Sequence, residues 1–145
     1  MSGRIIETLA LLTFASLVVT DVFFRKIYNT QNLLLLALFV LALLLDPTRS
    51  QTLLFSFIVA FAAALLALVL YALQGFAAGD VKLAFSTFLW LDPATLQPAL
   101  IVLAIATFLL ALFYGLRQRQ TQKTQTVPFG AALSAAGITA LCLSP

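Results

Sequence analysis

The chain has 145 residues, of which 63% are hydrophobic and 9% are charged, and its mean hydropathy is +1.11. A soluble domain of this length cannot bury so much apolar surface, so the composition predicts an integral membrane protein. The net charge of +3 comes without a basic stripe or interleaved aromatic and basic residues, which argues against nucleic-acid binding.

Two residue types that build many active sites are almost missing. The sequence contains no histidine and one cysteine, Cys142. This excludes zinc proteases of the His-Glu-x-x-His type, serine–histidine hydrolases, histidine-ligated haem, internal disulfides and cysteine-based zinc sites. If the protein is an enzyme, its carboxylates are the leading candidates for acid–base groups.

Long uncharged runs predict an all-α, multi-pass transmembrane bundle of about six helices, since a spanning helix needs about 20 apolar residues. The predicted helices cover about 5–22, 31–45, 52–73, 81–91, 97–115 and 127–143. The segment 81–91 is short, so it either crosses the membrane with a tilt or re-enters on one side. Polar stretches at 28–32, 46–50, 92–93 and 117–126 predict loops. We expect one integral-membrane domain over 1–145.

The basic residues predict which side of the membrane each loop faces. With six crossings, the loops after the first, third and fifth helices share one side and carry six of the eight basic residues. These are Arg25, Lys26, Lys82, Arg117, Arg119 and Lys123. By the positive-inside rule this side is cytoplasmic and both termini face out. Asp21 and Asp80 are then both near the cytoplasmic face.

Asp21 and Asp80 stand at the ends of long apolar runs in a chain with five acidic residues. An ionised carboxylate at the centre of a membrane helix costs roughly 2.5–3.5 kcal/mol, and less toward the interface. Two carboxylates about 4 Å apart repel by roughly 4 kcal/mol at an effective dielectric of about 20, so one keeps its proton. Peptide hydrolysis needs such a split, with one general base and one general acid. Either aspartate alone could instead cap a helix or face headgroup water.

Three segments of the chain resemble the motifs of a known family. They are Asp21-Val22-Phe23-Phe24-Arg25-Lys26-Ile27-Tyr28-Asn29, then Ala77-Ala78-Gly79-Asp80-Val81-Lys82-Leu83, and finally Val127-Pro128-Phe129-Gly130-Ala131. These segments are similar to the motifs of the type IV prepilin peptidases, which are membrane aspartic proteases of the GxGD type. Their order and spacing resemble those of the short peptidases that serve tight-adherence (Flp) pili.

The resemblance implies a specific function. Asp21 and Asp80 would be the catalytic pair of an aspartic endopeptidase that removes the basic leader from prepilins or pseudopilins. Cleavage would occur at the cytoplasmic face of the bacterial cytoplasmic membrane, with prepilin leader peptides and membrane lipids as partners and no metal or organic cofactor. Larger members of the family add a four-cysteine zinc-binding loop and methylate the product. This chain has one cysteine, so we expect cleavage without methylation.

Four neighbouring residues are predicted to support the site. They are Gly79, Lys82, Arg25 and Asn29. Each also has a simpler possible role. Lys82 and Arg25 could anchor the cytoplasmic side by the positive-inside rule. Asn29 could be a loop or helix-cap residue, and Gly79 could allow a tight backbone path.

Two positions depart from the family pattern. Tyr28 replaces a proline, which changes how rigidly the loop enters the second helix. Ala77 replaces the first motif glycine, a change that is harmful if the backbone there needs a positive φ and harmless if φ is ordinary.

Three other functions fit parts of the sequence. A small transporter or channel subunit could use membrane carboxylates for proton or cation coupling. A catalytically inactive pilus-assembly component is suggested by Ala77. A lipoprotein signal peptidase is disfavoured, because the paired Asn-Asp signatures of that family are not found.

Overall fold

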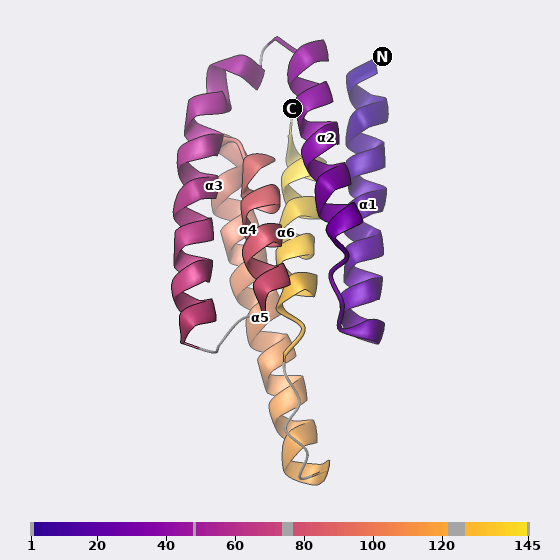
Figure 1. Ribbon diagram of the computed structural model, residues 1–145, viewed down its shortest axis with the longest axis vertical. Coiled ribbons are helices and arrows are strands. Elements are labelled where there is room, and N and C mark those ends of the chain that lie inside the picture. The colour runs from indigo at the N-terminus through magenta and orange to yellow at the C-terminus, as the bar shows by residue number, and fades with distance from the viewer. Residues whose placement is uncertain (1, 48, 74–76, 122–126, 145) are drawn as a thin grey trace.

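The structure, a computed structural model, describes residues 2–47, 49–73, 77–121 and 127–144 (Figure 1). This part of the chain forms six helices and no strands, which confirms the predicted all-α bundle. The helices are α1 (Ser2–Phe24), α2 (Asn29–Leu45), α3 (Arg49–Ala72), α4 (Ala78–Leu89), α5 (Pro93–Thr121) and α6 (Phe129–Leu143).

Consecutive helices run in opposite directions, so α1, α3 and α5 run toward one end of the bundle and α2, α4 and α6 run away from it (Figure 1). We call this the aspartate end, because Asp21 and Asp80 belong to it; the first residues of α1 and the last residues of α6 lie at the other end. Three helices contain segments long and apolar enough to span a membrane, at Arg4–Phe24, Arg49–Ala72 and Pro93–Arg117. Helices α2 and α6 are shorter apolar helices. Helix α4 has 12 residues, a length of about 18 Å against a hydrocarbon core of about 30 Å.

Helices α4 and α6 form the centre of the bundle. Helix α6 contacts α1, α4 and α5, whereas α4 contacts α2, α3 and α6. The buried face of α6 is built mainly from alanine and glycine, and small residues allow helices in a membrane to approach closely. At Gly137 a Cβ atom would lie 2.6 Å from the ring of Phe14, so α1 packs almost directly on the α6 backbone.

The outer helices expose their large apolar side chains. Leu44, Leu54 and Phe108 are 74%, 73% and 66% exposed. A continuous apolar exterior of this kind suits contact with lipid tails, in agreement with the composition.

Charged side chains connect α1 and α3 at the end of the bundle opposite Asp21 and Asp80. Glu7, near the start of α1, forms an ion pair with Arg49, the first residue of α3. The Arg49 guanidinium also lies over the Trp90 ring, 5.5 Å from its centroid. This pairing accounts for the acidic residue in the first apolar run, because a charge at the edge of a membrane helix is tolerated when a partner neutralises it.

Some predicted boundaries were wrong. Helix α5 continues to Thr121, although a loop was expected from Arg117, because the arginine and glutamine residues there favour helix and no proline or glycine interrupts them. Helix α4 begins at Ala78 rather than near 81, and α3 begins at Arg49 within an expected loop. Lys123, which entered the charge count, lies outside the described residues.

Candidate active site

The structure brings Asp21 and Asp80 to the same end of the bundle. Asp21 lies in the last turn of α1 and Asp80 in the first turn of α4, at the aspartate end. Each residue is only 6% exposed, and the two carboxyl groups are close enough to interact electrostatically. Helices α2 and α3 lie between α1 and α4 in the chain and run in opposite directions. The chain therefore returns to the end at which α1 finishes before α4 begins.

The Asp21 carboxylate is held by the N-terminus of α6. Its Oδ2 atom accepts a hydrogen bond of 2.8 Å from the backbone N–H of Ala131, the third residue of that helix. The first backbone N–H groups of a helix lack intrahelical partners, and carboxylates are favourable acceptors for them. The approach requires a glycine at the preceding position, because a Cβ atom on Gly130 would lie 2.9 Å from Asp21 Oδ2.

The Asp80 carboxylate is held by the start of its own helix. Its Oδ2 atom accepts a hydrogen bond of 3.0 Å from the backbone N–H of Ala77, which precedes α4. An acidic residue at the third helical position commonly reaches back in this way. Ala77 has φ −89° and ψ 154°, an extended conformation open to any residue. The alanine in place of the family's glycine therefore introduces no backbone strain.

Ile27 packs where the two aspartate-bearing helices meet α6. A Cβ atom on Gly79 would lie 3.2 Å from Ile27 Cβ, and one on Gly130 would lie 2.7 Å from Ile27 Cδ1. Gly79 lies inside α4 and none of the described glycines has a positive φ. The absence of a side chain at Gly79 therefore serves close packing, not an unusual backbone path.

Lys82 and Asn29 contact each other at the same end. The Lys82 Nζ atom donates a hydrogen bond of 3.2 Å to Asn29 Oδ1, and both residues are exposed. Asn29 is the first residue of α2, so this contact ties the start of α2 to the first turns of α4.

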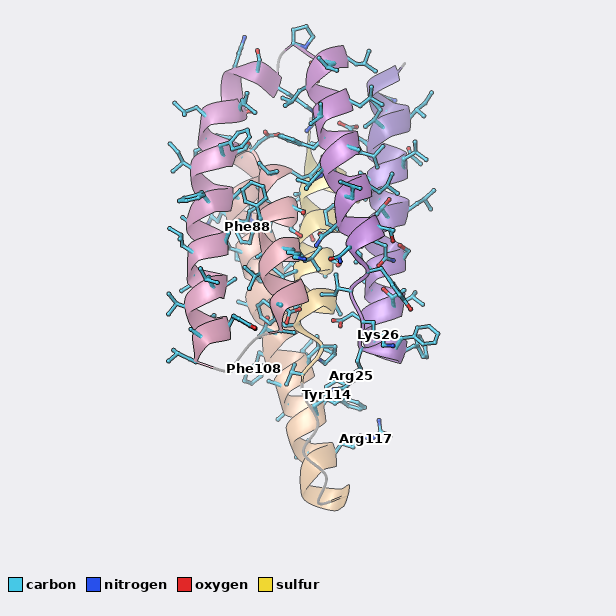
Figure 2. The ribbon with its side chains drawn as sticks, viewed as in Figure 1. Arg25, Lys26, Phe88, Phe108, Tyr114 and Arg117 are labelled. Carbon is cyan, nitrogen blue, oxygen red and sulfur yellow. The ribbon has the colours of Figure 1, made fainter. Side chains whose placement is uncertain are left out.

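Arg25 links the end of α1 to α5. It has φ 54°, a left-handed conformation that ends the helix, and its guanidinium lies over the Tyr114 ring, 4.5 Å from the centroid. Figure 2 shows Arg25 beside Tyr114, with Lys26 close by and Arg117 farther along α5. These basic side chains lie at the rim of the aspartate end.

Sequence reasoning missed Ile27, Gly130 and Ala131 as residues that shape this site. All three lie within the segments that resemble the family motifs, so the motif positions were the available signal. Within the described residues, no three His, Cys, Asp or Glu side chains gather closely enough to hold a metal ion.

The arrangement can perform acid–base chemistry on a peptide bond. Two interacting carboxyl groups are each oriented by a backbone N–H, and both lie close to the end of the membrane bundle. Orientation by main-chain donors restricts their motion, which favours productive geometry. One ionised and one protonated carboxyl group would provide a base for water and an acid for the carbonyl oxygen.

Comparison with known proteins identifies the family of the chain. A family model described as the type IV leader peptidase family matches residues 8–116, a range that contains both aspartates and ends before α6. Searches of curated proteins and of solved structures found no match. Because the matched range covers well over half of the sequence, the chain belongs to the type IV leader peptidase family.

Proposed function

We propose that this protein is an aspartic endopeptidase that removes the basic leader of type IV or Flp prepilins. The observation that carries the proposal is the interacting pair of buried carboxyl groups, Asp21 and Asp80, each oriented by a backbone N–H group. A role in helix capping alone would not require two acids from distant helices to lie within electrostatic range of each other, since neighbouring like charges are unfavourable.

In the proposed mechanism the two aspartates share one proton. The ionised carboxylate accepts a proton from a water molecule, and the oxygen of this water attacks the scissile carbonyl carbon. The protonated partner donates a hydrogen bond to the oxygen that becomes negative, and a proton then passes to the departing nitrogen. The products are the leader with a new carboxyl group and the shortened pilin with a new amino group.

We place the reaction at the cytoplasmic face of the bacterial cytoplasmic membrane, with both termini outside. The charge distribution supports this orientation, because Arg25, Lys26, Lys82 and Arg117 all belong to the aspartate end. Anionic lipid at that face attracts the basic leader and offsets repulsion from these side chains.

The test is cleavage of a co-expressed Flp-type prepilin, scored as loss of the leader on a gel. Wild-type protein should cleave, whereas Asp21→Asn and Asp80→Asn should each reduce cleavage by at least 1,000-fold, in the range seen when one member of a catalytic unit is removed. Asp46→Asn is the matched control, since Asp46 lies at the opposite end and its side chain is 40% exposed. Cleavage by either active-site variant, at wild-type accumulation in the membrane, would reject the pair.

A further inference from the structure

A cavity beside the first turns of α4 opens between α2 and α3. Its volume is about 510 Å³, and α4 forms its floor. Figure 1 shows α4 in the space between α2 and α3, which are joined at the end of the bundle opposite the aspartates. The lining comes from all three helices and comprises Asn29, Asn32, Leu33, Leu36, Ala64, Val81, Lys82, Phe85 and Ser86.

Asn32 is the unusual member of this lining. It is only 5% exposed, and neither atom of its side-chain amide has a hydrogen-bond partner among the described residues. A buried amide without partners is unfavourable, and more so where lipid limits the supply of water. Such a group is expected to bond to a molecule that enters the cavity.

The depth of Asn32 relative to Asp80 follows from the packing of α2 against α4. These helices run in the same direction, and the Phe39 and Trp90 rings meet at 5.6 Å between centroids. Counting back seven residues from Phe39 and from Trp90 gives Asn32 and Leu83, which therefore lie at about the same depth in the bundle. Asp80 is three residues before Leu83, so Asn32 lies about 4.5 Å deeper in the bundle at 1.5 Å per residue.

We propose that Asn32 binds the main chain of the substrate as an extended segment in this cavity, on the membrane side of the scissile bond. This inference rests on the proposed peptidase function. An amide side chain offers both donors and an acceptor, which match the N–H and C=O groups of an extended peptide. A lipid tail has no polar group that could satisfy Asn32.

The chemistry of the lining selects which part of the substrate enters. Leu33, Leu36, Val81 and Phe85 give the cavity apolar walls. The basic leader cannot be accommodated against them, because burying unpaired cations is costly. The lining therefore fits an apolar stretch of the substrate, while the basic leader stays at the basic rim.

The first test replaces the amide with an apolar group of similar size. In purified protein acting on a Flp-type prepilin that carries its leader, Asn32→Leu should raise KM by about tenfold or more and leave kcat within about twofold. The same variant should be as thermally stable as wild type or more so, because an unpartnered polar group has been removed. A purely structural role for Asn32 predicts the opposite, a lower Tm with unchanged KM, and that result would overturn the inference.

The second test does not depend on catalysis. A photoreactive phenylalanine analogue is placed at Leu33 or at Leu34 in an Asp80→Asn background with the same uncleaved prepilin. Both positions are exposed on α2, but Leu33 lines the cavity whereas Leu34 lines a separate groove between α1 and α2. We expect a prepilin adduct at Leu33 and none at Leu34.

The outcomes separate the two proposals. An adduct at Leu33 without cleavage by wild-type protein supports the docking site and rejects the peptidase function. Cleavage by wild-type protein with no adduct at Leu33, or with lipid adducts alone, rejects the docking site and leaves the peptidase intact. Equal amounts of prepilin adduct at Leu33 and Leu34 also reject the docking site, because binding would then not be confined to the cavity.

Discussion

Gly130 should contribute strongly to cleavage although it has no reactive group. An alanine Cβ at this position would lie 2.9 Å from Asp21 Oδ2, 3.1 Å from Asp21 Cγ and 2.7 Å from Ile27 Cδ1. Contacts this short force the carboxylate to move away from α6. The movement would break or lengthen the 2.8 Å hydrogen bond from Ala131 N–H.

The magnitude follows from that hydrogen bond. A bond to a charged group contributes about 1.5–3 kcal/mol, and each 1.36 kcal/mol corresponds to about tenfold in rate. Gly130→Ala should therefore lower cleavage by about 10- to 150-fold. The assay is leader removal from a co-expressed prepilin, normalised to the amount of folded enzyme in the membrane.

Two other glycines provide matched controls. Gly137→Ala places a Cβ atom 2.6 Å from the Phe14 ring, far along α6 from Asp21. It should reduce stability by about 1–3 kcal/mol through overpacking but preserve cleavage per folded molecule. Gly115→Ala meets no atom within 4 Å and should change neither property.

The result that refutes the reasoning is wild-type cleavage by Gly130→Ala at wild-type accumulation. A second variant isolates the cause, since Ile27→Val removes the Cδ1 contact but leaves the conflict with Asp21. If Ile27→Val restored full activity to Gly130→Ala, packing against Ile27 and not the position of the carboxylate would explain the loss.

The remaining predictions concern positions on either side of the site. Ala77→Gly should change cleavage by less than about twofold, because the alanine already has an ordinary φ of −89°. The same change should reduce stability by about 0.4–1 kcal/mol. A tenfold or greater increase in cleavage in the prepilin assay would show that the alanine methyl obstructs the substrate. Glu7→Gln should lower the thermal stability of the purified protein by about 1 kcal/mol through loss of the ion pair with Arg49, without affecting cleavage per folded molecule. Asp46→Asn should have a smaller effect on stability, since its carboxylate is 3.9 Å from Arg49; equal effects would argue against a specific role for the Glu7 pair.

Several helix boundaries differ from those that the local sequence pattern predicts. The polar stretch that begins at Arg117 was predicted as a loop, yet it continues α5 to Thr121. Polarity indicates that a segment lies in water, but it does not distinguish a solvated helix from a loop when the residues favour helix. Similarly, α4 starts earlier than its apolar run because the Asp80 carboxylate bonds to the Ala77 N–H.

The sequence by itself predicted a membrane protein, the number of helices and the end of the bundle to which Asp21 and Asp80 belong. Apolar runs longer than a soluble core can hide require lipid, and alternation of direction returns the chain to the same end after two further helices. The motif segments also predicted the family.

Only the tertiary structure decided what surrounds those aspartates. The bond between Asp21 and Ala131 joins residues 110 positions apart, and the unpartnered amide of Asn32 is recognised only once α2, α3 and α4 are placed around it. Hydrophobic patterns show that a helix is apolar but not which helix it meets, because many apolar surfaces pack with similar energy. The close approaches at Gly79, Gly130 and Gly137 select one arrangement, since a backbone without a side chain admits a neighbour that no other residue would.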